Sequence, residues 1–60
     1  MTFQEALSIV QEVQANNGLP GLLETLEFMS FPNNREELTS QELRAHRVVF
    51  NEMSKLFASA

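Results

Sequence analysis

The sequence contains no cysteine and only one histidine, which removes two common ways of stabilising a small protein. No disulfide can form, and a single histidine without cysteine cannot supply a structural zinc site within one chain. A chain of 60 residues buries only about 60% of the surface that its unfolded form exposes. Association with a second copy or with a larger partner is the remaining support, so we expect a domain that self-associates or binds a partner.

Long apolar runs are also missing. No segment approaches the roughly 20 apolar residues that span a bilayer. The first residues lack the basic region and the long apolar region of a secretion signal. We therefore expect a cytoplasmic protein without a membrane partner.

Positive charge is scarce and confined to the second half of the chain. The sequence has four basic and eight acidic residues, a formal net charge of −4, and residues 1–34 contain no lysine or arginine. Binding to nucleic acid needs a basic footprint, so this balance argues against unaided contact with DNA or RNA. The basic residues are Arg35, Arg44, Arg47 and Lys55.

The first predicted helix covers residues 3–15. Thr2 and Glu5 have the spacing of a capping box, in which each side chain bonds the other residue's backbone N–H. Apolar residues recur on one face, and Asn16-Asn17-Gly18 is a typical helix end because Asn and Gly tolerate left-handed backbone. The predicted apolar face consists of Phe3, Ala6, Leu7, Ile9, Val10 and Val13.

A second helix is predicted over residues 20–29, with Pro20 as its first residue, where the missing N–H is tolerated. Its predicted apolar face consists of Leu22, Leu23, Leu26 and Met29. A loop over residues 30–34 follows, because Pro32 biases Phe31 away from helical backbone. Residues 35–38 are expected to add one helical turn capped by Asn34.

The third predicted helix covers residues 40–58 and follows a second capping box, formed by Thr39 and Glu42. Its predicted apolar stripe consists of Leu43, His46, Val49, Phe50, Met53, Leu56 and Phe57. The predicted fold is therefore an all-α single domain over residues 1–60, with three helices and short connections. The width of the last stripe indicates that one side packs inward while the other meets a partner, so self-association through this helix is expected.

His46 is the natural candidate for chemistry, since it lies on the stripe one turn after Glu42. A metal site would need both residues from each chain of a symmetric dimer. The simpler interpretation is a histidine in an interface or at the edge of the core, whose ring N–H bonds Glu42 or a backbone carbonyl. No serine or threonine is placed beside a base. We predict no catalytic residue, no metal ligand, no cofactor and no small-molecule substrate.

Two surfaces are candidates for partner binding. Arg44, Arg47 and Lys55 share a helix face, which either docks acidic groups or is a solvated face paired with Glu24 or Glu27. Phe28 and Phe31 form an exposed aromatic pair beside the loop, unless the second helix is rotated or the loop folds back and buries both. The full set of candidates is Phe28, Phe31, Arg44, His46, Arg47, Met53, Lys55 and Phe57.

The last predicted helix carries Leu43-Arg44-Ala45-His46-Arg47 and then Met53-Ser54-Lys55-Leu56. This pattern resembles the last helix of the theta subunit of bacterial DNA polymerase III. Gly18-Leu19-Pro20 resembles that family's turn into its second helix. The family's aromatic residue before the last helix is missing here. The resemblance implies a non-catalytic subunit that binds and stabilises the proofreading exonuclease of a replicase.

A looser resemblance links the chain to the Hha-type modulators of nucleoid proteins. It is carried by Met1-Thr2-Phe3-Gln4-Glu5, by Leu38-Thr39 with Glu42-Leu43, and by His46-Arg47, with gaps between them. The sequence thus predicts a non-catalytic interaction module, a small helical accessory or inhibitor protein in replication or transcription. The alternative is a homodimeric nucleic-acid-associated regulator, of phage or plasmid type, that uses the basic face of the last helix.

Overall fold

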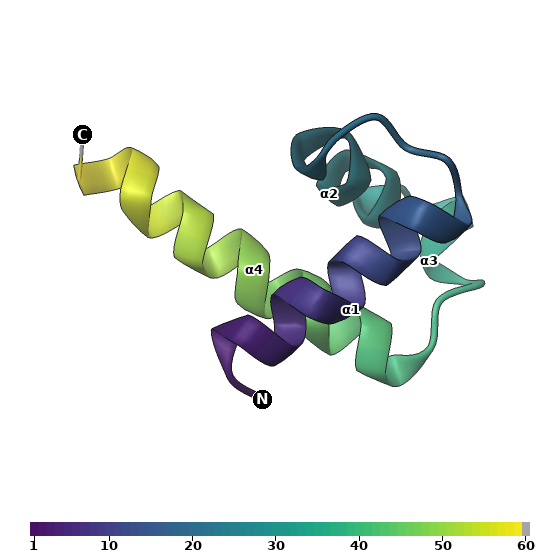
Figure 1. Ribbon diagram of the computed structural model, residues 1–60, viewed down its shortest axis with the longest axis horizontal. Coiled ribbons are helices and arrows are strands. Elements are labelled where there is room, and N and C mark those ends of the chain that lie inside the picture. Colours follow the sequence, from purple (N-terminus) through teal and green to yellow (C-terminus); the bar gives the residue numbers. More distant parts are fainter. Residues whose placement is uncertain (60) are drawn as a thin grey trace.

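The computed structural model describes residues 1–59, with only the backbone of Ser59. This part of the chain is all-α and has no strand, as predicted: α1 spans Phe3–Asn16, α2 Leu22–Ser30, α3 Pro32–Arg35 and α4 Ser40–Ser59 (Figure 1). The described residues form four helices and not the three predicted, because a single separate turn, α3, follows α2. Ala60 of the predicted domain lies outside the described residues.

Helix α1 has one half of its predicted capping box. The Glu5 N–H donates to Thr2 Oγ1 at 3.2 Å, but within the described residues the reciprocal bond from the Thr2 N–H to the Glu5 side chain is not formed. At the other end Gly18 has φ 63°. The Gly18 N–H donates to Ala15 O at 3.3 Å, and the Leu19 N–H donates to Gln14 O at 3.0 Å. These two bonds make a Schellman motif, which confirms the predicted helix end.

Helix α2 begins two residues later than predicted. Gly21, in extended backbone, is its N-cap, and the first helical bond joins the Thr25 N–H to Gly21 O at 3.1 Å. A helix that began at Pro20 would have Leu19 as its N-cap. Leucine is among the least favoured N-cap residues whereas glycine is well tolerated there, and the Leu19 N–H already closes α1.

The predicted loop over 30–34 and the predicted turn over 35–38 are both shifted. Ser30 belongs to α2, and Phe31 (φ −70°, ψ 132°) separates it from α3, in which Pro32 is the first residue. Proline fits that position because its φ is already helical. Asn34 does not act as a cap, since its Nδ2 donates to Phe28 O at 2.9 Å.

Helix α4 begins with the second capping box in full. The Glu42 N–H donates to Thr39 Oγ1 at 3.1 Å, and the Thr39 N–H donates to Glu42 Oε1 at 2.8 Å. Its bounds agree with the predicted 40–58 to within one residue. At 1.5 Å per residue the helix is about 30 Å long, close to the longest extent of the molecule, 32 Å.

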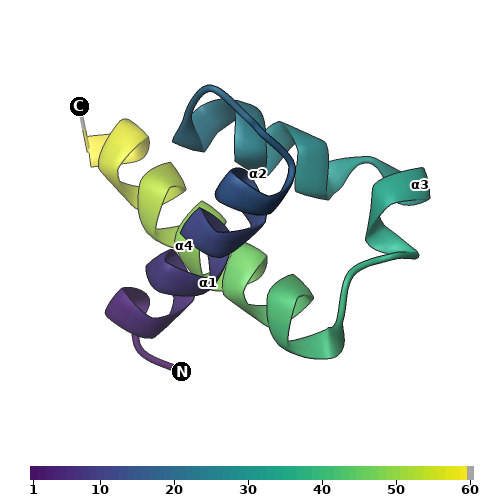
Figure 2. The ribbon, with the colours of Figure 1, turned by 45° about the vertical axis from the view of Figure 1, so that its right-hand side comes forward.

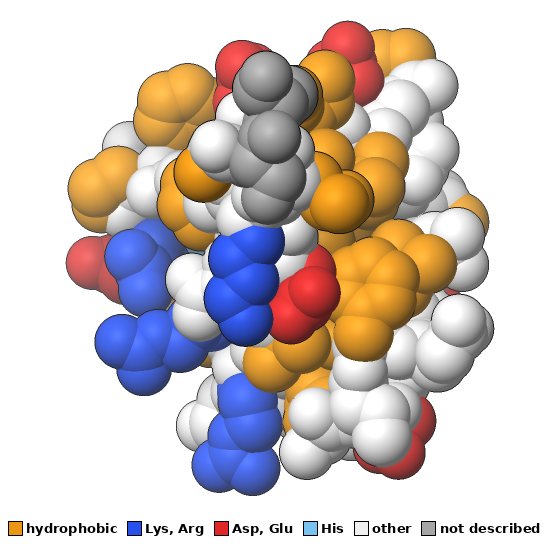
Figure 3. Space-filling model, turned by 90° about the vertical axis from the view of Figure 1, so that its left-hand side faces the viewer, with side chains coloured by type: hydrophobic (Ala, Val, Ile, Leu, Met, Phe, Trp, Pro, Cys, Tyr) orange, Lys and Arg blue, Asp and Glu red, His pale blue; other side chains and the backbone are white. Residues whose placement is uncertain are grey.

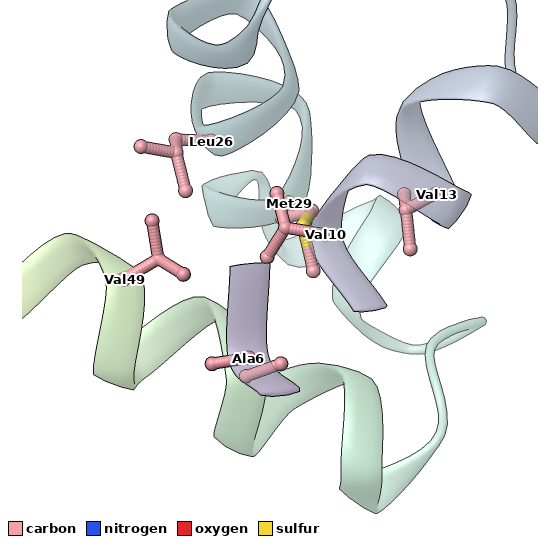
Figure 4. Close-up of a cluster of buried hydrophobic side chains, with 7 residues drawn as sticks. Ala6, Val10, Val13, Leu26, Met29 and Val49 are labelled. Carbon is pink, nitrogen blue, oxygen red and sulfur yellow. The ribbon is translucent and has the colours of Figure 1, made fainter. Parts of the chain in front are cut away.

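The core lies where α1 crosses α4 under α2 (Figures 2 and 4). Helix α1 contacts α4 more extensively than any other pair of helices, and α2 contacts α4 least among the main pairs. Small residues allow the close crossing, since Ala6 and Ala45 are both fully buried. The buried side chains are Ala6, Val10, Val13, Thr25, Leu26, Met29, Ala45 and Val49.

Four side chains assigned to apolar stripes from the sequence are more than half exposed. They are Leu23, Phe50, Leu56 and Phe57. Helix α2 is rotated so that Thr25 faces the core and Leu23 lies at its edge. Helix α4 extends past its neighbours, and Figure 1 shows its last turns, in yellow, projecting beyond them. Among the described residues, no helix combines the length and apolar character that a bilayer crossing requires.

Candidate docking surface

The second half of α4 carries an apolar surface that the core does not cover. Phe50 is 52% exposed and Phe57 71%, and Leu23 of α2 adds a side chain that is 55% exposed. Leu56 is 72% exposed but does not share a groove with these three side chains. Isolated exposed apolar residues are normal, but a cluster of large ones marks a contact site. Of the described residues after Val49, Met53 is the half-buried apolar one that packs against the core.

A groove of about 310 Å³ lies between α2 and α4, and Leu23, Phe50 and Phe57 are among its lining residues. Glu27 and Ser30 are polar residues at this groove, and Ser54 is a third. We call it the apolar groove; its lining residues are Leu23, Leu26, Glu27, Ser30, Phe50, Met53, Ser54 and Phe57. The groove remains open because α2 and α4 have few contacts.

A second hollow, of about 460 Å³, lies on the other side of Phe50. Arg35 from α3 and Arg44 and Arg47 from α4 surround it. We call it the basic hollow; it is lined by Arg35, Leu43, Arg44, His46, Arg47, Phe50 and Asn51. Figure 3 shows lysine and arginine side chains, in blue, gathered at the lower left and centre of one face, with apolar side chains, in orange, to their right and above them.

The arginines of the basic hollow are exposed and form no ion pair with any carboxylate of residues 1–59. Lys55 differs, since its Nζ lies 3.4 Å from Glu52 Oε1. The interpretation in which the basic residues of α4 pair with Glu24 or Glu27 is therefore wrong for the described chain. The predicted basic face is divided, because Lys55 does not line the basic hollow and Arg35 does.

His46 joins α4 to α2. Its Nε2 lies 3.2 Å from Leu26 O; the carbonyl can only accept, so Nε2 carries the proton. The ring also packs against Phe50, with centroids 5.9 Å apart. Burial lowers the pKa of His46 below 6.5, the bond to Leu26 opposes this change, and the charge of Arg35 adds to it. The bond to a backbone carbonyl is one of the two predicted alternatives, and Glu42 instead caps α4.

The aromatic pair proposed from the sequence is separated. Phe28 is half-buried and packs against the core, whereas Phe31 is 59% exposed at the start of α3. Met53 and Phe57 do line the apolar groove, and Arg44, His46 and Arg47 line the basic hollow. Sequence reasoning missed Leu23 and Phe50, because their spacing matched the core stripes of their helices. It missed Arg35 because that residue lies on a different element.

The described residues contain no group of three histidine or acidic side chains that could hold a metal ion. The buried polar side chains of the described chain all have hydrogen-bond partners, so none is left for a ligand inside the core. The candidate binding sites of the described residues are therefore on the surface, at the apolar groove and the basic hollow.

No family model, no curated protein and no solved structure matched the chain in comparisons of its sequence and fold.

Proposed function

We propose that the protein is a non-catalytic interaction module, a small cytoplasmic accessory or inhibitor protein that binds a larger protein. The observation that supports this best is the apolar groove, which carries three large side chains that are each more than half exposed: Leu23, Phe50 and Phe57. Fully burying such a side chain contributes about 1.5–3 kcal/mol. Phenylalanine is also enriched in the cores of protein interfaces.

The resemblance to the theta subunit supports a role in replication or transcription. The Ala-His-Arg part of that pattern has a structural basis in this chain. Ala45 allows α1 to cross α4, His46 bonds α2, and Arg47 is left at the surface. With Ala45 and His46 packed against the other helices, the opposite side of the last helix is left for a partner. This is the arrangement expected of a non-catalytic subunit.

Affinity capture from host extract with three forms of the protein tests this function. The baits are the wild type, the double variant Leu23→Ser/Phe57→Ser, and Leu56→Ser. Leu56 is the matched control, because it is as exposed as Phe57 and does not line the apolar groove. We expect a protein that the wild type and Leu56→Ser retain equally and that the double variant loses, measured by quantitative mass spectrometry.

Circular dichroism of all three baits establishes that each one is helical. Since the substituted side chains are exposed, the helical signal should be unchanged. Equal capture by all three baits would contradict the proposed surface.

A second candidate function is favoured by the basic hollow. Three arginines from two helices face one space, as in proteins that neutralise phosphates. The protein would then be a nucleic-acid-associated regulator, acting as a homodimer, despite its net charge of −4. Fluorescence anisotropy with labelled DNA at low salt tests it: Arg44→Glu/Arg47→Glu should abolish binding, and no binding by the wild type would discard it.

A further inference from the structure

We propose that the partner element is an amphipathic α-helix that places apolar side chains in the apolar groove and carboxylates in the basic hollow. This inference rests on the proposed interaction function and adds the chemistry of the partner. Phe50 lines both depressions. They therefore follow one another along α4, and a single rod-shaped element can fill both.

The dimensions fit a helix of about four turns. From Phe50 to Phe57 is about 10 Å along α4, and from Arg44 to Phe57 about 20 Å. Two turns of a partner helix would present apolar side chains three or four residues apart to the apolar groove. The adjoining turns would reach the basic hollow. A peptide bound by β-strand addition would need the edge of a sheet for its backbone, and the described chain has no strand.

The charges of the two depressions determine which end of the partner helix is acidic. The arginines of the basic hollow have no ion-pair partner among the described residues, and an arginine can bind a carboxylate through two parallel bonds. The apolar groove has Glu27 at its side, which disfavours acidic groups at that end. Carboxylates of the partner therefore belong beside Arg44 and Arg47, and apolar side chains beside Phe57.

A second copy of the chain fits this surface poorly. In an antiparallel pair of α4 helices with its two-fold axis at Phe50, Arg47 would face Met53 of the other copy. Leu43 would likewise face Phe57. The basic hollow of each copy would thus lie on the apolar groove of the other. The arginines would then be buried against apolar side chains with no carboxylate beside them, which costs free energy. A separate partner with an acidic and an apolar end avoids this mismatch.

Selection from a displayed library of random peptides of about 16 residues, a little over four helical turns, tests the inference with no assumption about the host protein. We expect the enriched peptides to become helical on binding. They should carry apolar residues spaced by three or four positions, followed or preceded by Asp or Glu. Their affinities are then measured by anisotropy against the wild type and four variants.

The variants come in two matched pairs. Phe57→Ser and Arg44→Gln/Arg47→Gln should each weaken binding about tenfold or more. The two controls, Leu56→Ser and Lys55→Gln, alter an apolar and a basic side chain of α4 outside the two depressions. They should change the affinity for the peptide less than about twofold. Binding should also weaken as salt is raised, because the carboxylate contacts are screened.

Each other result has a definite meaning. Peptides that need Phe57 but neither acidic residues nor the arginines would overturn the acidic partner and leave the interaction function standing. Enrichment of no peptide, or binding that ignores Phe57, would overturn both. Sedimentation showing a dimer that Phe57→Ser dissociates would make a second copy the occupant and overturn the inference, as would DNA binding that needs the arginines.

Discussion

Thr39 holds the start of α4 through both bonds of a capping box. Thr39→Ala should lower the free energy of unfolding by about 1 kcal/mol, the usual effect of losing an N-cap side chain. This is a large fraction of the stability of a small domain. Urea unfolding followed by circular dichroism measures it. A change near zero would mean that the cap bonds contribute nothing and that packing alone sets the start of α4.

Glu42 and Glu5 provide the control for that prediction. Both carboxylates lie in the first turn of a helix and interact equally with its dipole. Glu42 bonds the Thr39 N–H, whereas Glu5 offers only its backbone N–H to Thr2. Glu42→Ala should therefore cost more than Glu5→Ala, and equal costs would contradict a contribution from the reciprocal bond.

His46 should make stability depend on pH. Burial lowers its pKa in the folded protein below 6.5, so in acid the unfolded chain takes up a proton that the folded chain does not. The free energy of unfolding then falls as the pH drops below the pKa of His46 in the unfolded chain. Above that pKa the contribution of His46 is fully present. The free energy of unfolding should be lower at about pH 5.5 than at about pH 7.5.

The chain has no second histidine, so His46→Gln should remove most of this dependence while leaving an amide that can donate to Leu26 O. Urea unfolding at the two pH values makes the comparison. A wild type that becomes more stable in acid would show that the charged ring is favoured in the fold. At the residue scale the sequence predicted the Thr39 cap, and for His46 a bond to Glu42 or to a backbone carbonyl, because both follow from local chemistry. The cap and the bond to a backbone carbonyl are confirmed. The sequence did not predict that Leu26 would be the partner of His46.

Helix α2 is oriented by Thr25, which is fully buried. Its hydroxyl donates to Gly21 O at 2.7 Å, and the same carbonyl also accepts the Thr25 N–H at 3.1 Å. Thr25→Val keeps the packed shape and leaves the carbonyl bonded, so the change in stability should be below about 0.7 kcal/mol. Thr25→Ser removes a packed methyl group and should cost about 1 kcal/mol.

Thermal and urea unfolding of both variants measure the two losses of stability. A larger loss for Thr25→Val than for Thr25→Ser would show that the hydroxyl, and not the methyl group, orients the helix. Leu23 was predicted to be buried because a short helix with leucines on two sides does not define its own rotation. Thr25 and Ala45 were missed for a different reason, since an apolar pattern does not identify a polar or small side chain as buried, and these two are buried because other helices pack over them.

Helix α4 should be stable in its first half and open in its second. Ala45 and Val49 are fully buried, but of the described residues beyond Val49 Met53 is the half-buried apolar one that packs against the core. Local opening is easiest where few apolar contacts must be broken. Amide hydrogen exchange should therefore be slow over residues 45–49 and much faster over 54–58. Uniform protection along α4 would contradict an unpartnered second half and would indicate that a second copy covers it.

The molecule as a whole has a small margin of stability. At the usual 0.05–0.15 kcal/mol per residue, a chain of this length is stable by roughly 3–9 kcal/mol. Its buried apolar core consists of seven side chains, two of them alanines. The sequence predicted this modest core and the all-α class from periodicity and caps. It named Met53 and Phe57 of the last helix as surface candidates. It did not predict that Leu23 and Phe50 belong to the same surface, because that depends on how α4 extends past α2.

Binding of a partner should therefore offset the stability lost by a substitution in the core. Val10 is fully buried in α1, and Val10→Ala should cost about 2 kcal/mol. A docking peptide at 100 times its Kd stabilises a protein by about 2.7 kcal/mol if it binds only the folded form. Adding a selected peptide to Val10→Ala should thus return its melting temperature to about that of the free wild type. The triple variant Leu23→Ser/Phe57→Ser/Val10→Ala should gain nothing, because it keeps the same weakened core but lacks the apolar groove. An equal gain in both proteins would place the peptide elsewhere on the fold, and a gain in neither would mean that docking does not depend on the folded surface.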